Sequence, residues 1–269
     1  FLFLGGHPGG YLIGGALLVA TNVLFGVSMV FYNAALGVPA TLVGAALALA
    51  LVVDAISDPL VGGWSDRLRT RWGRRLPFMY AAALPSAFLF WVFWNPPAWA
   101  LASDVMAFWY LFLLTAAIRL TITLFDVPVM ALVPELTDSY DGRSELLSYH
   151  SNMLYGWTAL VSAAMYGYFL QPTPEFATGV LNVDGYQQAG VAGAFVVGLT
   201  MLTCAAGLHK HIPRLQRHQE SESHVARHFR DWLKPFRNRS LAALLLSRLI
   251  SAAVYGTQAA LFQYMARYF

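Results

Sequence analysis

Long apolar runs alternate with short polar segments along almost the whole chain, and many of these runs are long enough to cross a membrane as a helix. The pattern predicts seven spanning helices, at Gly10–Leu36, Ala40–Gly62, Pro77–Trp94, Val105–Val133, Glu145–Leu170, Tyr186–Leu208 and Ser240–Tyr268. The charged stretch Lys210–Arg239 separates the sixth helix from the seventh. We therefore expect an all-α polytopic membrane protein.

The spacing of these helices predicts how the chain is organised. Six closely spaced helices, a long linker and one further helix are the plan of a transporter built from two parallel halves. We expect a six-helix transmembrane bundle over residues 1–209, a cytoplasmic linker over 210–239, and the start of a truncated second bundle over 240–269. Within the linker, Ser223–Phe236 mixes aromatic and basic residues. This segment fits either an amphipathic helix on the membrane surface or a solvated linker.

Composition and the placement of charge support the membrane assignment. Hydrophobic residues make up 58% of the chain and charged residues 12%, against about 25% charged residues in soluble proteins. Of the 17 Lys and Arg residues, 14 fall in the segments after the second, fourth and sixth helices. Positive charge concentrates on the cytoplasmic side, so we expect the N-terminus and the basic loops there, in a multi-pass protein of a bacterial inner membrane. The single cysteine, Cys204, excludes an internal disulfide.

Charged side chains inside the predicted spans are candidates for function. The set consists of Asp54, Asp58, Arg119, Asp126 and Arg248. Asp54 and Asp58 are four residues apart, so they share one helical face, with Ser57 beside them. Thr123 and Asp126 lie at a similar depth on the fourth helix. Each charge at the centre of a bilayer costs roughly 2.5–3.5 kcal/mol, so such residues usually have a function.

Asp54, Ser57, Asp58 and Thr123 offer carboxylate and hydroxyl oxygens, the ligands that hard cations prefer. Two carboxylates this close do not both stay ionised without a cation, and one then takes up a proton. The pattern therefore predicts a site for a monovalent coupling ion, Na⁺, Li⁺ or H⁺, and no other cofactor. The alternative is that the acids only form structural ion pairs with arginines in the spans.

Arg119, Thr123 and Asp126 share one face of the fourth helix at spacings i, i+4 and i+7. Arg119 is a candidate to receive an anionic group of the substrate, or to hold Asp126 until substrate displaces it. A permanent pair of Arg119 with Asp126 or Asp58 is the alternative, and both interpretations stay open. Asn22 and Tyr32 on the first helix are further candidates for substrate binding.

Three stretches resemble the glycoside–pentoside–hexuronide:cation symporters, the melibiose permease-like family of the major facilitator superfamily. The first combines Asp54-Ala-Ile-Ser-Asp-Pro59 with Gly62-Gly-Trp-Ser-Asp-Arg67 and Arg71-Trp-Gly-Arg-Arg-Leu-Pro-Phe78. The second is Asp126-Val-Pro-Val-Met-Ala-Leu-Val-Pro-Glu-Leu-Thr-Asp138 with Tyr140-Asp-Gly-Arg-Ser-Glu-Leu-Leu-Ser-Tyr149, and the third is Asn238–Tyr264. The resemblance implies a major facilitator-type six-helix bundle plus the first helix of a second half, in an N-terminal fragment of a twelve-helix protein.

The resemblance also implies roles for single residues. It places the cation site at Asp54, Ser57, Asp58 and Thr123, and a contact to sugar hydroxyls at Asp126. Two family positions differ: the first helix has leucines near residues 17 and 18 where the family has a Lys–Asp pair, and His150 falls at or next to the position of a family arginine.

The loop after the second helix resembles the cytoplasmic gating motif of the superfamily. The residues concerned are Asp66, Arg67, Arg74 and Arg75. A charge cluster of this kind can latch the two halves of a transporter together and release them as they rock. Contact with anionic lipid is the alternative role.

The leading hypothesis is a secondary active symporter that couples a monovalent cation to uptake of a small organic solute, a sugar or glycoside, by alternating access. An amphipathic or anionic solute such as a lysolipid is the alternative. A hypothesis of another class is a non-transporting membrane assembly or sensor subunit. The expected partners are the solute, the cation, membrane lipid and the missing C-terminal helices, without nucleic acid. The chain has no nucleophile–base pattern or phosphate loop, so we do not expect an enzyme.

Overall fold

The computed structural model describes residues 27–68, 70–136, 139–176 and 178–209, together with Ala243, Leu246 and Ser247. Contacts divide the chain into two compact units, Phe1–Arg217 and His218–Phe269. The helices below all belong to the first unit. Most of the predicted first helix, the linker and almost all of the predicted seventh helix, including Arg248, lie outside the described residues.

The described part of the chain is helical and contains no β-strand. In chain order the elements are η2 (Phe31–Ala35, a π-helix), α2 (Ala40–Arg67), α3 (Leu76–Trp94), η3 (Ala98–Leu101, a 3₁₀-helix), α4 (Asp104–Leu136), α5 (Tyr140–Ala164), η4 (Met165–Phe169, a π-helix), η5 (Gly179–Leu181, a 3₁₀-helix) and α6 (Val183–Leu208). Among these elements, α2, α3, α4 and α6 are long and apolar enough to cross a membrane. The fold is all-α and of the membrane type that the apolar pattern predicts.

Two of the predicted helix boundaries are wrong. The second helix was predicted to end at Gly62, but α2 continues to Arg67. The fifth was predicted to begin at Glu145, but α5 begins at Tyr140 because the Ser139 hydroxyl accepts a hydrogen bond from the Gly142 amide at 3.0 Å and caps the helix. Arg143 therefore lies in the first turn of α5 and not in a loop.

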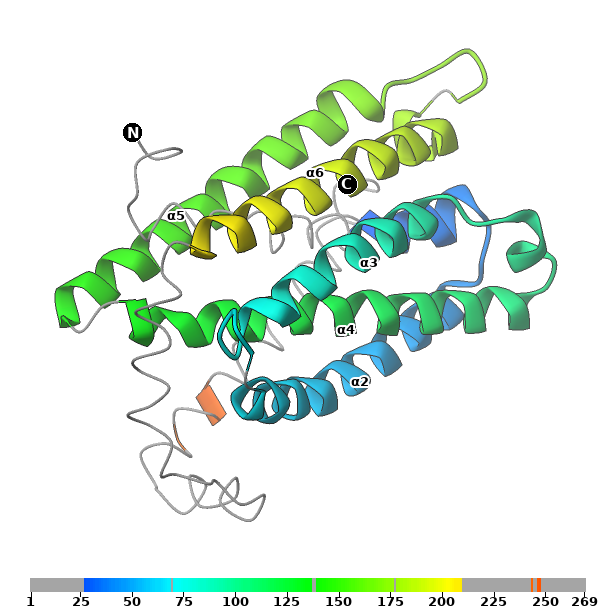
Figure 1. Cartoon of the computed structure of the whole chain (residues 1–269). Coiled ribbons are helices and arrows are strands. Elements are labelled where there is room, and N and C mark those ends of the chain that lie inside the picture. Colours follow the sequence, from blue (N-terminus) through cyan, green and yellow to red (C-terminus); the bar gives the residue numbers. More distant parts are fainter. Residues whose placement is uncertain are drawn as a thin grey trace. The chain divides into compact units, whose positions relative to one another are not determined.

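The packing order of the helices can be followed in Figure 1, where α3 lies between α6 and α4, and α4 in turn packs against α2. Glycines bring α3 and α6 close together. A Cβ atom added to Gly190 would lie 2.3 Å from the Cβ of Trp94, and one added to Gly193 would lie 2.7 Å from the Phe90 ring. Small residues allow helix backbones in membranes to approach in this way.

Aromatic rings fill the junction where α3 ends and α6 begins. Trp94 stacks on Tyr186 with ring centroids 5.6 Å apart and ring planes only 6° from parallel. Phe31 of η2 contacts both rings, at centroid distances of 5.1 Å and 4.8 Å. All three side chains are buried. These three rings form a closely packed part of the core at the end of α3.

Prolines interrupt three of the apolar helices: Pro59 in α2, Pro85 in α3, and Pro128 and Pro134 in α4. Pro59 directly follows Asp58 and lies one helical turn after Ala55. A proline has no N–H, so the Ala55 carbonyl loses its hydrogen bond within α2. Membrane helices tolerate this loss where neighbouring groups compensate for it.

Candidate functional site

The centre of the site is the Thr123 hydroxyl of α4, which faces two carboxylates of α2. Its Oγ1 atom lies 2.8 Å from Asp58 Oδ1 and 3.3 Å from Asp54 Oδ1. Thr123 is 3% exposed. The packing of α2 against α4 therefore brings together three of the four side chains that the sequence predicted as cation ligands.

A hydroxyl group carries one proton, so Thr123 can donate to only one of these carboxylates at a time. The shorter distance favours Asp58. The lone pairs of Oγ1 then stay available for a further partner. The arrangement collects two carboxylates and one hydroxyl within a small volume, which is a set of oxygen donors of the kind that Na⁺ or Li⁺ binds.

Ser57, the fourth predicted ligand, is buried on the same helix as the two acids. Its hydroxyl donates to the backbone carbonyl oxygen of Asp54 at 3.0 Å. The Ser57 oxygen keeps lone pairs for a further partner, but its proton is directed at the backbone. Among the described residues, no group of three or more His, Cys, Asp or Glu side chains is placed to hold a metal ion. A cation here would depend on hydroxyl oxygens beside the two carboxylates.

Arg119 forms an ion pair with Asp54. Its Nη1 lies 2.8 Å from Asp54 Oδ2, and each side chain is 25% exposed. The sequence left a pair of Arg119 with Asp126 or with Asp58 open, and the structure instead shows the pair with Asp54. With Thr123 near Oδ1 and Arg119 on Oδ2, both oxygens of Asp54 have partners.

Three polar atoms along α4 are buried without a hydrogen-bond partner in the described part of the chain. They are Thr115 Oγ1, Arg119 Nε and Asp126 Oδ1. Together with Thr123 these residues follow the spacing i, i+4, i+8 and i+11, which keeps them on one helical face. An unpaired buried polar atom costs free energy comparable to a lost hydrogen bond, so this face of α4 is suited to bind a polar ligand.

Thr115 was not among the residues that sequence reasoning selected. Its place four residues before Arg119 was visible in the sequence, but a threonine in an apolar helix carries no signal of its own. Only its burial, at 1% exposure, and its unpaired hydroxyl mark it out.

Tyr32 does not lie where the sequence analysis expected it. The side chain is fully buried, and its hydroxyl donates to the Phe93 carbonyl oxygen at 2.6 Å. Its ring also contacts the Phe93 ring, with centroids 5.3 Å apart. The geometry makes Tyr32 a packing residue of the apolar core and does not support the expected role in substrate binding. Asn22, the other candidate on the first helix, lies outside the described residues.

The four predicted gating residues lie around the connection between α2 and α3. Arg75 is buried, pairs with Asp66 at 3.3 Å, and donates a hydrogen bond to the Ala131 carbonyl oxygen of α4. Arg67 is exposed in the last turn of α2, and Arg74 is partly buried in the connection. Arg75, at the N-cap of α3, thus contacts both α2 and α4.

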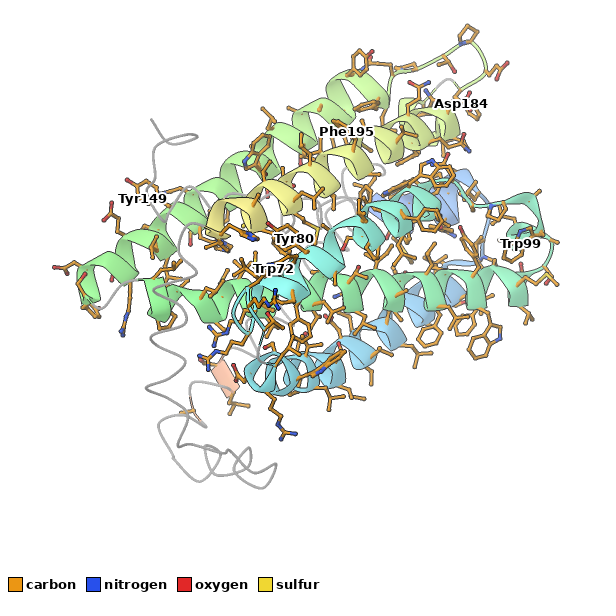
Figure 2. All side chains as sticks on the ribbon, in the orientation of Figure 1. Trp72, Tyr80, Trp99, Tyr149, Asp184 and Phe195 are labelled. Atoms are coloured by element: carbon orange, nitrogen blue, oxygen red, sulfur yellow. The ribbon has the colours of Figure 1, made fainter. Side chains whose placement is uncertain are left out.

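An aromatic cluster next to this connection was not predicted. Trp72, Tyr80 and His209 form a triangle with ring centroids 5.5 to 5.6 Å apart. Tyr80 and His209 also share a hydrogen bond of 2.9 Å between the hydroxyl and Nδ1. Figure 2 shows Trp72 and Tyr80 by the end of α3 that is farther from Trp99. The cluster joins the α2–α3 connection to the end of α6.

Comparison with known proteins gives a consistent result. The chain matches the family described as MFS/sugar transport protein over residues 10–269. It is 34% identical to an uncharacterized symporter of Synechocystis sp. over 145 residues, which are 53% of this chain and 27% of that protein. It is 28% identical to the inner membrane symporter YicJ of Escherichia coli over 195 residues, 72% of this chain and 40% of that protein.

A third relative is the glucuronide carrier protein homolog of Escherichia coli, which is 31% identical over 142 residues, 51% of this chain and 30% of that protein. In each case the match spans less than half the length of the relative. Because the family match extends over nearly the whole chain, this chain belongs to the MFS/sugar transport protein family of the major facilitator superfamily, the melibiose permease-like symporters.

Proposed function

We propose that this chain supplies the cation-binding half of a secondary active symporter, which couples a monovalent cation to uptake of a small solute of the sugar or glycoside class by alternating access. The family and the names of the relatives support transport of this general kind. The positive charges between the predicted helices favour cytoplasmic basic loops in a bacterial inner membrane.

The observation that carries the proposal is the contact of Thr123 with both Asp54 and Asp58. Three oxygen-bearing side chains from two helices converge although most residues of α2 and α4 are apolar. Acidic residues in a membrane span are costly, at roughly 2.5–3.5 kcal/mol each near the centre. One arginine compensates one of the two acids, so Asp58 remains for a cation or a proton.

Coupling follows from this charge balance. Without a cation, the carboxylates repel one another, and the solute-binding arrangement around α4 is less stable. A bound Na⁺, Li⁺ or proton relieves the repulsion and shifts the population toward the arrangement that binds solute. The polar face with Asp126 and Thr115 is the proposed place for solute hydroxyl groups, since both side chains have an unpaired buried oxygen.

The test is Asp58→Asn in the complete carrier, with uptake and thermal stability measured against Na⁺, Li⁺ and pH. Asparagine keeps the shape of the side chain but removes the charge, so we expect the response to cations to disappear while the protein still folds. Unfolding can be followed through the thiol of Cys204, which is buried and becomes reactive to thiol dyes on unfolding, once any cysteine elsewhere in the complete carrier has been replaced.

The matched control is Asp104→Asn, which makes the same chemical change at an exposed position in the first turn of α4. It should leave the cation response unchanged. A wild-type protein that shows no response to any cation, or an Asp58→Asn variant that keeps the full response, would contradict the proposal and favour a non-transporting membrane subunit.

A further inference from the structure

We propose that Arg119 binds an oxyanion of the solute, a carboxylate or a phosphate, and that the coupling cation makes Arg119 available by taking over Asp54. The inference rests on the proposed function, because it requires the cation site at Asp54 and Asp58. It adds the charge of the solute and the residue that recognises it. Its first observation is the direct contact between Arg119 Nη1 and Asp54 Oδ2 at 2.8 Å.

The Asp54 carboxylate cannot bind the guanidinium group of Arg119 and a cation equally strongly at the same time. Its Oδ2 is engaged by Arg119, and its Oδ1 lies 3.3 Å from the Thr123 hydroxyl. A cation bound between Asp54 and Asp58 places a second positive charge within a few ångströms of the guanidinium group. Repulsion between like charges increases as the distance falls, so occupation of the site weakens the Arg119–Asp54 pair.

A released guanidinium group needs another anion. The guanidinium group of an arginine is a permanent cation, and a charge left unpaired away from water is strongly unfavourable. Hydroxyl groups of a neutral solute can accept hydrogen bonds but cannot compensate the charge. An oxyanion does both, and the planar donor fork of arginine fits carboxylate and phosphate oxygens in pairs.

The surroundings of Arg119 already provide unused donors. Its Nε is buried without a hydrogen-bond partner in the described part of the chain, and so is Thr115 Oγ1 one turn earlier on the same face of α4. The Asp54 contact uses Nη1, so Nε is a separate donor of the same guanidinium group. A solute oxyanion would meet the guanidinium fork together with one hydroxyl, which is a site for a charged group and not for a sugar ring alone.

The two binding events must then reinforce one another. If the cation frees Arg119 for the oxyanion, the oxyanion must equally favour cation binding, because coupling between two sites is reciprocal. Removing the arginine should break this linkage in a characteristic way. Asp54 loses its competitor, so cation affinity rises, while affinity for the oxyanion falls.

The experiment measures binding to the complete carrier with three probes, each with and without Na⁺: methyl β-D-glucuronide, sn-glycerol 3-phosphate and the neutral methyl β-D-glucoside. In the wild type we expect Na⁺ to raise affinity for one or both anionic probes about tenfold and to leave the neutral probe unaffected. The first two probes distinguish a carboxylate from a phosphate as the preferred group.

The decisive variants are Arg119→Gln and Arg119→Lys. The glutamine variant should bind Na⁺ about tenfold more tightly, and Na⁺ should no longer raise its affinity for the anionic probes. The lysine variant should keep part of the linkage, because the positive charge remains. Leu120→Ala, at an exposed neighbouring position of α4, serves as the control and should behave as the wild type.

A purely structural ion pair predicts a different pattern. Arg119→Gln would then destabilise the fold without changing the ranking of the three probes, and this result overturns the inference. If the single variant does not fold, Asp54→Asn/Arg119→Gln restores the charge balance and should still lose the preference for anionic probes. A wild type that responds to Na⁺ but prefers the neutral probe contradicts the inference alone, whereas one without any cation response contradicts the proposed function as well.

Discussion

The contacts that α3 makes with α6 and those that α2 makes with α4 differ in kind. Between α3 and α6, Gly190 and Gly193 let the aromatic side chains of Trp94 and Phe90 approach the helix backbone, and the packed residues are mostly apolar. Between α2 and α4, the contact includes the Arg119–Asp54 pair, with both side chains partly exposed.

The difference separates two roles within one unit. The α3–α6 contact gains its stability from close packing, which tolerates little change in shape. The α2–α4 contact places charges and unpaired polar atoms in an apolar setting, which lowers stability but allows binding. We therefore expect changes at α3–α6 to affect mainly folding and changes at α2–α4 to affect mainly the response to ligands.

The largest effect on stability is expected for Gly190→Ala. The added Cβ would lie 2.3 Å from Trp94 Cβ, so the helices must move apart. Overpacking of this kind costs about 1–3 kcal/mol, and the melting temperature measured through Cys204 should fall. In contrast, Gly44→Ala in α2 adds a Cβ that meets nothing within 4 Å and should be neutral or stabilising. Equal effects of the two changes would show that the α3–α6 contact is not tight.

A smaller effect is expected for Tyr32→Phe. The change removes the hydrogen bond to the Phe93 carbonyl oxygen but keeps the ring in its buried place. We expect a loss of stability of about 0.5–1.5 kcal/mol and an unchanged cation response. Tyr32→Leu is the stronger comparison, since it also removes the ring contact. If Tyr32→Phe instead reduced solute binding at unchanged stability, Tyr32 would belong to the site and not to the core.

The smallest effect on stability is expected for Thr123→Val, which keeps the shape of the side chain. The change removes one hydrogen bond, to the Asp58 carboxylate, which is exposed on the described helices, so the cost should be about 0.5 kcal/mol, the lower end for a single hydrogen bond. The cation response, however, should weaken markedly, and Thr123→Ser should retain it. If the valine variant has a clearly lower melting temperature but still responds to cations, the role of Thr123 is structural.

The sequence predicted those features that depend on one helix at a time. The apolar runs located α2, α3, α4 and α6 within a few residues. Helical spacing alone placed Asp54 and Asp58 on one face of their helix. Thr123 was predicted at a similar depth on a second helix, and the structure shows it in contact with both acids. The start of α5 was missed because Ser139 caps that helix, and any of several polar residues there could have done so.

Features that depend on how helices cross could not be predicted in the same way. Three acids in the predicted spans were possible partners for Arg119, and only the packing of α2 on α4 selects Asp54. A tyrosine in an apolar helix fits a binding cavity and a core equally well. Tyr32 lies in the core because its hydroxyl donates to the carbonyl oxygen of Phe93, which is 61 residues further along the chain.

Pro59 has a mechanical consequence for α2. Because it leaves the Ala55 carbonyl without its helical hydrogen bond, α2 can bend at this point at a lower cost than elsewhere in its apolar run. The weakened turn runs from Ala55 to Pro59, so it begins directly after Asp54 and includes Asp58. A bend in this turn would change the distance between the two acids and at the same time move the end of α2 that carries Asp66.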